Sequence, residues 1–278
     1  MNKDELTHHE FSQFAQFLER QCGILLSQNK SYLVKSRLMP LVREGNFGTL
    51  SELIKSTISN GQARLRDRVV DAMTTNETLW FRDKYPFDIL SNTLFERYAK
   101  SRKRVRIWSA ACSSGQEPYS IAMLVQEYKQ RNPGAFPAGV EIVATDISTD
   151  MLARAQKACY DPLSIGRGLS EERKQRFFKV AADKHMELVP NVAKMVTFKL
   201  INLLDSYTAL GQFDIVFCRN VLIYFSPKNK AKILQQIAAC LQKEGILFLG
   251  ASESIADLSK SFTLVRNNPG LYYQKNTS

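Results

Sequence analysis

Alternating apolar segments over the last two-thirds of the chain constrain its fold more than any other feature. Short runs typical of strands stand at 105–109, 140–146, 196–200, 213–218 and 245–250. Segments with helical spacing of apolar residues lie between several of them, at 119–128, 149–158 and 228–241. Strands that alternate with helices predict a parallel sheet covered on both faces. Two further runs, 262–265 and 271–273, would close this sheet as an antiparallel hairpin.

The first part of the chain shows helical periodicity and no strand signal. Apolar residues recur at helical spacing between Glu10 and Cys22. Thr7 and Glu10 form a capping-box pattern before this segment, and Gly23 is placed to end it. Three further helices are expected at about 30–43, 49–59 and 62–73. Together these segments predict a small all-helical domain.

The two patterns divide the chain. We expect a helical N-terminal domain at 1–72, a linker that contributes to the active site at 73–90, and a sheet domain at 91–278. About forty residues separate the second helix of the sheet domain from its third strand, more than a connection requires. We therefore expect an inserted subdomain at about 160–195, with a helix near 169–178 and a short strand within 185–189.

Charge and cysteine content narrow the class of protein. The chain has 38 basic and 27 acidic residues, a formal charge of +11, which favours an acidic partner: nucleic acid, an anionic membrane face or an acidic protein. No apolar run reaches the roughly 20 residues of a membrane helix, and the polar start Met1–Leu6 does not resemble a signal peptide. Five scattered cysteines without CxxC spacing favour reduced thiols and argue against zinc. We expect a cytoplasmic protein that does not insert into a membrane.

A turn of small residues follows the first expected strand, from Trp108 to the helix start at Pro118. Such a turn lets a ligand approach the backbone, and the helix N-terminus offers free N–H groups. A tight turn without a ligand would have the same composition. Because the turn contains a single glycine, Gly115, it does not match the GxGxxG pattern of dinucleotide sites.

Polar residues end two other expected strands and would face the same crevice. Asp146 can accept hydrogen bonds from both hydroxyls of a ribose, or it can cap the helix that follows. Arg219, Asn220 and Tyr224 follow the fourth strand and could reach a substrate. Alternatively, Arg219 forms a structural salt bridge and Tyr224 packs in the core.

Five motifs in the same order resemble those of the CheR family, the chemotaxis receptor glutamate methyltransferases. They are Thr75-Asn76-Glu77-Thr78-Leu79-Trp80-Phe81-Arg82-Asp83, Ser109-Ala110-Ala111-Cys112-Ser113-Ser114-Gly115-Gln116-Glu117-Pro118-Tyr119-Ser120, Ala144-Thr145-Asp146-Ile147, Asn202-Leu203-Leu204 and Phe213-Asp214-Ile215-Val216-Phe217-Cys218-Arg219-Asn220-Val221-Leu222-Ile223-Tyr224-Phe225. The resemblance spans nearly the whole chain. It implies a Rossmann-like S-adenosylmethionine methyltransferase sheet with a small inserted antiparallel subdomain.

The resemblance also implies roles for individual residues. S-adenosylmethionine would be the cofactor, S-adenosylhomocysteine the product, and no metal would take part. Glu117 would hold the amino end of the methionine moiety, Asp146 the ribose, and Asn202 and Leu203 the adenine region. The remaining residues expected to line the cofactor and active site are Asn76, Thr78, Arg82, Arg219 and Asn220. The catalytic candidates, which would orient the substrate carboxylate, are Arg82 and Tyr224.

These implied roles agree with simple chemistry. A glutamate carboxylate has a pKa of about 4.3 and is ionised at neutral pH, so it needs no general base to become a nucleophile. Alignment and desolvation would then supply most of the catalysis. The three histidines, His8, His9 and His185, all lie outside the crevice motifs.

The resemblance suggests how the protein meets its substrate. Receptor methylation helices in this family are rich in glutamate, and Lys30, Lys35, Arg37 and Arg43 would form a basic face that docks on them. The same face could simply be solvated. Some relatives bind a receptor C-terminal pentapeptide through a glycine-rich loop in the insertion, but 178–188 contains no glycine here. We therefore expect methylation that does not depend on this tether.

The basic charge and the expected crevice also agree with two other functions. A nucleic-acid methyltransferase would require a base-flipping pocket or an RNA-binding module, and neither is recognisable. A non-catalytic sensor of S-adenosylmethionine would have lost crevice residues, whereas Arg82, Glu117, Asp146, Asn220 and Tyr224 are all present.

Overall fold

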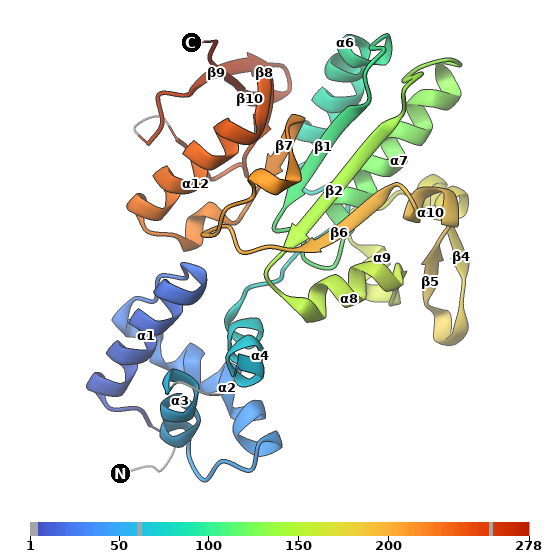
Figure 1. Ribbon diagram of the computed structural model, residues 1–278. Helices are drawn as coiled ribbons and strands as arrows, with labels where there is room; N and C mark the ends of the chain where they lie inside the picture. Colours follow the sequence, from blue (N-terminus) through green and yellow to red (C-terminus); the bar gives the residue numbers. More distant parts are fainter. Residues whose placement is uncertain (1–4, 60–62, 256–257, 278) are drawn as a thin grey trace. The chain divides into compact units, whose positions relative to one another are not determined.

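The computed structural model describes residues 5–59, 63–255 and 258–277. Its contacts group the chain into two compact units (Figure 1). The helical unit comprises residues 1–75 together with 224–230, and the α/β unit comprises 76–223 and 231–278. Residues 1–4 and the expected helix start at Gln62 lie outside the described residues.

The helical unit contains α1 (His8–Cys22), α2 (Ser31–Glu44), α3 (Leu50–Ile58) and α4 (Ala63–Met73), with the short 3₁₀ turn η1 (Gln28–Lys30) before α2. The predicted capping box is confirmed: Thr7 accepts from the backbone of Glu10, and the Glu10 side chain accepts from the backbone of Thr7. Gly23 ends α1 in the left-handed conformation, as predicted. The core of this unit includes Phe14, Leu18 and Leu38, all fully buried.

The α/β unit is built on a seven-stranded sheet in the order β6-β2-β1-β7-β8-β10-β9. Its strands are β1 (Val105–Ala110), β2 (Val140–Asp146), β6 (Val196–Leu200), β7 (Phe213–Cys218), β8 (Leu241–Phe248), β9 (Phe262–Asn267) and β10 (Gly270–Lys275). The first five are parallel, and β9 and β10 form the predicted antiparallel hairpin at one edge. The Rossmann-like fold class is therefore confirmed.

Helices cover both faces of this sheet. They are α7 (Gln116–Arg131), α8 (Thr149–Lys157), α12 (Pro227–Cys240) and a continuous helical run made of α5 (Tyr85–Ile89), the π-helical turn η2 (Leu90–Leu94) and α6 (Phe95–Ala99). Side chains on β1 alternate between the two faces, as strand geometry requires. Ile107 joins the buried cluster that contains residues of α5 and α7, whereas Trp108 packs against Tyr207 and Phe213.

The expected inserted subdomain is present between β2 and β6, where Figure 1 labels α10, β4 and β5. A three-stranded antiparallel sheet in the order β3-β5-β4 forms its centre. Its elements are β3 (Cys159–Tyr160), α9 (Pro162–Gly166), α10 (Glu171–Phe177), β4 (Phe178–Val180), η3 (Ala182–Lys184), β5 (Met186–Leu188) and α11 (Pro190–Ala193). Two further 3₁₀ turns are η4 (Thr208–Leu210) in the α/β unit and η5 (Leu222–Tyr224), whose last residue belongs to the helical unit.

Several elements differ from the sequence expectation. The helical run 85–99 was not expected, and β3 and β4 are too short to give a pattern of alternation. β8 begins at Leu241 rather than at Gly245, because Leu241 already pairs with Phe213 of β7. A register irregularity follows this pair, and it includes Glu244 with a positive φ of 57°. None of the helices in the described part of the chain combines the length with the apolar character that a membrane span needs.

Candidate functional site

The candidate site lies where the parallel strands end. β1 has β2 on one side and β7 on the other, so the chain reverses its direction of growth across the sheet at β1. Ligands of open α/β sheets bind in the crevice outside the carboxyl ends of the strands at such a switch point. Ala110, Asp146 and Cys218 end these three strands, and the predicted motifs follow them directly.

The turn after β1 has an unusual backbone. Ala111 and Ser113 have positive φ values of 57° and 50°, and Gly115 has a φ of 93°. The positive φ of Gly115 favours glycine, and a Cβ atom there would also be crowded, at 3.0 Å from the Cβ of Ala155 and 3.1 Å from the Tyr119 ring. The turn thereby brings the start of α7 close to α8.

Asp146 joins this turn to the end of β2. One carboxylate oxygen accepts from the backbone N–H of Ser113 at 2.7 Å, and the other accepts from Ser148 N–H at 2.9 Å. The alternative that Asp146 caps the following helix is wrong, because the Ser148 side chain caps α8 through the N–H of Met151. An acidic side chain at the end of the second parallel strand is placed to accept hydrogen bonds from the hydroxyls of a ribose.

The predicted adenine-side residues stand beside Asp146. Leu200, the last residue of β6, is the register partner of Asp146, and Ile201 N–H donates to the Asp146 carbonyl at 2.9 Å. Asn202 comes next and accepts from Leu204 N–H through its side-chain oxygen at 3.0 Å. Leu203 is buried. The structure therefore brings the second-strand and third-strand motifs together.

Arg219 is the centre of a buried charged cluster. Its side chain is 1% exposed and donates to Glu117 at 2.9 Å and to Asp83 at 2.7 Å. It also donates to the backbone carbonyl of Arg82 at 2.8 Å. Glu117 accepts in addition from the Ser109 hydroxyl at 2.8 Å. The structural salt bridge that was weighed for Arg219 is thus present, and it lies between three of the crevice motifs.

The segment before α5 carries Asn76, Thr78 and Arg82, and the fold brings it against the turn after β1. The carbonyl of Asn76 accepts from the Ser113 hydroxyl at 2.8 Å. Arg82 is half-buried and donates to the carbonyl of Glu77 at 3.0 Å. Thr78, between them, is also half-buried.

Two atoms in the cluster favour a bound polar group. Arg219 Nε and Asn220 Oδ1 are buried and have no hydrogen-bond partner among the residues that the structure describes. Unpaired buried polar atoms are costly, and a donor and an acceptor on adjacent residues are complementary to a ligand with both functions. An amino acid moiety has both, so these residues fit S-adenosylmethionine.

Cys112 is the one thiol within the turn, and its chemistry matters beside a methyl donor. Burial raises the pKa of the Cys112 thiol well above its usual value, and the nearby carboxylates of Asp146 and Glu117 raise it further. The side chain is therefore a neutral thiol at physiological pH. A neutral thiol is a weak nucleophile, so Cys112 is a packing residue here.

Sequence reasoning missed two residues of this site. Asp83 ends the first motif, and its pairing with Arg219 was not predicted. Glu253 lies after β8 and accepts from the backbone N–H of Asn220 at 2.7 Å, of Gly250 at 2.7 Å and of Ile223 at 3.3 Å. Its position just beyond the carboxyl end of a parallel strand was the available signal.

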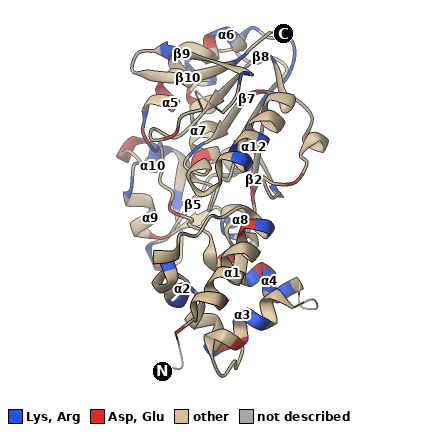
Figure 2. Cartoon of the chain, turned by 90° about the vertical axis from the view of Figure 1, so that its left-hand side faces the viewer, with Lys and Arg blue, Asp and Glu red and all other residues tan. Residues whose placement is uncertain are grey.

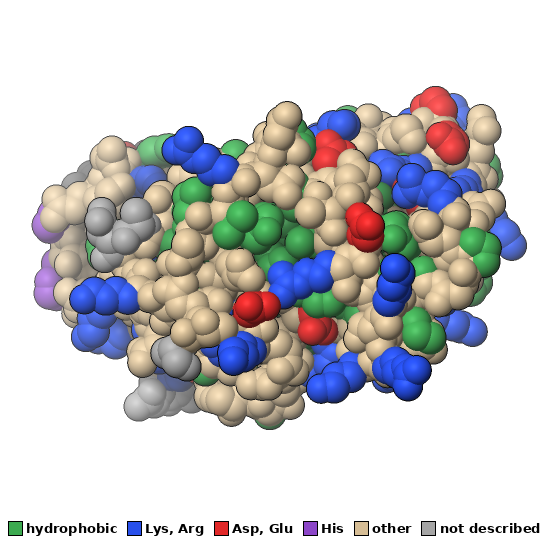
Figure 3. Space-filling view, turned by 90° about the horizontal axis from the view of Figure 1, so that it is seen from above, with side chains coloured by type: hydrophobic (Ala, Val, Ile, Leu, Met, Phe, Trp, Pro, Cys, Tyr) green, Lys and Arg blue, Asp and Glu red, His purple; other side chains and the backbone are tan. Residues whose placement is uncertain are grey.

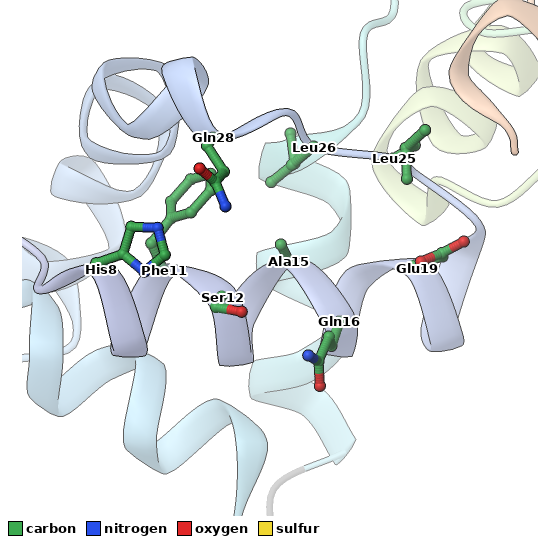
Figure 4. Close-up of a pocket in the computed structure, with 9 residues that line it drawn as sticks. All are labelled: His8, Phe11, Ser12, Ala15, Gln16, Glu19, Leu25, Leu26 and Gln28. Carbon is green, nitrogen blue, oxygen red and sulfur yellow. The ribbon is translucent and has the colours of Figure 1, made fainter.

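Tyr224 groups with the helical unit rather than with the crevice residues. It ends the turn η5 and is half-buried, and its carbonyl accepts from Leu25 N–H at 2.9 Å. Its expected role in catalysis stays a prediction. The same unit has a hollow of about 200 Å³ between one face of α1 and the segment 25–28 (Figure 4). His8 and Glu19 line it at separate ends of α1, so it holds no compact group of catalytic side chains.

Comparison with known proteins assigns the class and then the family. Residues 76–270 match the family described as "CheR methyltransferase, SAM binding domain", and residues 9–74 match "CheR methyltransferase, all-alpha domain". The protein is thus an S-adenosylmethionine-dependent methyltransferase. More narrowly, the chain belongs to the CheR methyltransferase family.

Full-length relatives support this assignment. The "Chemotaxis protein methyltransferase" of Vibrio parahaemolyticus is 51% identical over 97% of this chain and 98% of that protein. The "Chemotaxis protein methyltransferase Cher2" of Pseudomonas putida is 49% identical over 95% of this chain and 97% of that protein. The solved structure of magnesium protoporphyrin IX methyltransferase from Synechocystis matches over 85% of this chain and 94% of that protein, at 16% identity. Its TM-score of 0.38 is too low to support a conclusion.

Proposed function

We propose that this protein methylates glutamate side chains of methyl-accepting chemotaxis receptors in the cytoplasm, and that the product is a glutamate methyl ester. The observation that carries the proposal is the retention of the crevice motifs around a buried Arg219 cluster in a chain 51% identical to a chemotaxis protein methyltransferase. The cluster contains no histidine. A carboxylate substrate, already ionised, would require none.

The residues of the crevice would divide the work as follows. When bound, S-adenosylmethionine supplies a methyl group on a positively charged sulfur. Glu117 would hold the amino end of its methionine moiety, Asp146 its ribose, and Asn202 with Leu203 its adenine region. The substrate carboxylate oxygen would bond to the methyl carbon as the carbon–sulfur bond breaks, and no proton is transferred. Arg82, with Tyr224, would orient that carboxylate.

The carboxylate must be held without being neutralised. A guanidinium pairs with a carboxylate through two hydrogen bonds, and too tight a pair would weaken the nucleophile. Arg219 is committed to Glu117 and Asp83, so it is not available for this task. Arg82 is better suited, because it is only half-buried and its guanidinium donates to a neutral carbonyl, that of Glu77.

The basic face of the helical unit would dock on the acidic receptor helices. Lys30 and Arg43 are exposed and Lys35 is half-buried, whereas Arg37 donates to the carbonyls of Met73 and Thr74. We therefore narrow the proposed docking face to Lys30, Lys35 and Arg43. Basic residues are marked along α2, α3 and α4 in Figure 2. Figure 3, which looks at the molecule from above, shows Lys and Arg side chains spread over that face as well. A broad positive field of this kind would steer an acidic partner.

We also propose that methylation does not depend on a receptor C-terminal pentapeptide. The stretch 178–188, which forms β4, η3 and β5, contains no glycine. Calorimetry with such a pentapeptide is expected to detect no binding at micromolar concentration. Micromolar affinity would contradict this part of the proposal alone.

A single assay tests the main proposal. The protein is incubated with labelled S-adenosylmethionine and a receptor cytoplasmic fragment, and the product is treated with alkali. Esters release labelled methanol, whereas methylated bases and amides do not. Label that resists alkali, or that enters RNA instead of the receptor, would exclude a glutamate methyl ester as the product. S-adenosylhomocysteine binding without any transfer would favour the sensor function.

A further inference from the structure

The short turn that carries Arg82 has a backbone that requires support. Phe81, Asp83 and Lys84 have positive φ values of 50°, 64° and 51°. Residues with a Cβ rarely adopt this region, and such conformations persist only where the surroundings hold them. Any group that holds this turn therefore affects the direction of the Arg82 side chain.

The sheet edge holds one side of the turn. Arg219 donates to the Arg82 carbonyl at 2.8 Å and to the Asp83 carboxylate at 2.7 Å. On the same side, the Phe81 ring meets Phe87 edge to face at 5.3 Å between centroids. The two bonds from Arg219 belong to the cluster described above, and Phe87 lies on α5 of the α/β unit.

The inserted subdomain holds the other side. Trp80 N–H donates to the carbonyl of Arg167 at 3.2 Å, and the Trp80 indole donates to the carbonyl of Ser164 at 3.1 Å. A Cβ atom at Gly168 would collide with the Trp80 carbonyl oxygen, so the two backbones meet as closely as glycine allows. The insertion is therefore packed directly against the residue that precedes the turn.

Arg173, on α10 of the insertion, completes this support. Its guanidinium carbon lies 3.9 Å from the centroid of the Phe81 ring, within the range of a cation–π contact. Two hydrogen bonds to Glu127 on α7, at 2.7 and 3.0 Å, fix the plane of the guanidinium. Next to the ring is a hollow of about 260 Å³ that Phe81, Glu127 and Arg173 help to line. Without Arg173, the Phe81 ring would have room to move.

We propose that Arg173 is a positioning residue for methyl transfer. It holds Phe81, and through Phe81 it sets the backbone from which Arg82 reaches the substrate carboxylate. This inference rests on the proposed function, and it assigns the inserted subdomain a role within the catalytic domain itself. Within the part of the chain that the structure describes, Arg173 bonds to Glu127 and not to Asp146 or Glu117, so affinity for the cofactor should depend little on it.

The test compares Arg173→Met and Arg173→Lys with a matched control, Arg176→Met. Arg176 lies one turn further along α10, stacks on Phe177 at 4.9 Å and bonds to Gln130 of α7, so it bridges the same two helices without contacting the turn. For each variant we would measure kcat and KM with a receptor fragment, and the Kd of S-adenosylhomocysteine by calorimetry. Hydrogen exchange of the amides of residues 80–84 would be followed by mass spectrometry.

We expect Arg173→Met to lower kcat about tenfold, with the Kd of S-adenosylhomocysteine changed less than about twofold. Exchange of the 80–84 amides should accelerate, and Arg173→Lys should recover part of kcat because it keeps the cation over the ring. Arg176→Met should resemble the wild type. An unchanged kcat and exchange rate in Arg173→Met, or equal losses in Arg176→Met, would overturn the proposal.

The two proposals fail in different ways. If the wild-type protein binds S-adenosylhomocysteine but does not methylate receptor glutamates, the proposed function is wrong. The exchange measurement still decides whether Arg173 holds the turn, because it requires no substrate. If methylation occurs and exchange does not respond to Arg173→Met, only the positioning role is wrong.

Discussion

Arg37 in the helical unit and Arg219 in the α/β unit use their guanidinium groups in different ways. Arg37 is half-buried and donates to two backbone carbonyls at the end of α4 and to the Thr75 hydroxyl. Arg219 is fully buried and pairs with two carboxylates as well as one carbonyl. The first joins two helices of one unit, and the second joins the crevice motifs.

The difference indicates which charged residues can be replaced at little cost in stability and which cannot. A buried ion requires each of its partners, because removal of one leaves an uncompensated charge in a region of low dielectric constant. Exposed cations such as Lys30 and Arg43 act through a field that salt screens, and a neighbouring cation can replace part of their effect. The four predictions that follow test this comparison.

The largest effect is expected from Arg219→Met. It leaves Glu117 and Asp83 without their buried cation, so the free energy of unfolding should fall by about 3–5 kcal/mol. Urea denaturation measures this loss, and Arg37→Met is the comparison, with an expected cost of about 1 kcal/mol for its hydrogen bonds. Equal losses in the two variants would remove the distinction between these arginines.

A smaller loss is expected from Glu253→Ala. The substitution leaves the N–H groups of Asn220, Gly250 and Ile223 without their acceptor. The first two are part-buried, and leaving such donors unsatisfied costs about 1–3 kcal/mol. The Kd of S-adenosylhomocysteine should rise in parallel, since Asn220 is an expected cofactor contact. Calorimetry and denaturation on the same sample measure both effects. A loss of stability with unchanged affinity for S-adenosylhomocysteine would show that Glu253 supports the fold and not cofactor binding.

Charge reversal on the docking face should change recognition only. The double variant Lys30→Glu with Arg43→Glu is expected to raise KM for a receptor fragment about fivefold at low salt, and less at high salt. The matched control, Lys243→Glu with Lys260→Glu, makes the same change of charge at exposed positions of the α/β unit. If KM is unchanged at low ionic strength, or rises equally in the control, the docking role is wrong.

The smallest effect is expected at Glu10, where the pKa of the carboxyl is lowered to about 2. The Ser51 hydroxyl and the Thr7 backbone donate to it, and Lys55 lies 3.2 Å away. Because the folded pKa lies below the ordinary value, the stabilisation is present above about pH 4.5 and is lost as the pH falls towards 2. Glu10→Gln should therefore lower the free energy of unfolding at pH 7 by up to about 1 kcal/mol, and Tm should fall slightly with it. Thermal melts at pH 7, 4 and 2 should show the difference vanishing, and a constant difference would contradict the assignment.

Most of the fold could be predicted from local patterns. The bounds of β2, β6 and β7 and the capping box of α1 agree with the expectation, since period-two runs and capping residues act within a few positions of the chain. The position of Asp146 at the crevice follows from the rule that the carboxyl ends of parallel strands share one edge. The motif resemblance then led to the family.

Short or irregular elements could not be predicted in the same way. β3 and β4 contain two and three residues, too few for a period to be read. The run 85–99 includes a π-helical turn, which shifts the phase of its apolar residues. Arg37 was expected on the outer side of α2, but its long side chain donates to the carbonyls of Met73 and Thr74, which lie 36 and 37 positions later in the chain.

By itself, the sequence determined the order of the elements, the parallel sheet and the edge at which a ligand would bind. Only the tertiary structure decided that Arg219 pairs with Asp83, 136 positions away, and that Glu253 supports Asn220. It also decided that Arg173 of the insertion stacks on Phe81. Periodicity depends on neighbours along the chain, whereas buried charges select partners by distance and desolvation after the chain has folded.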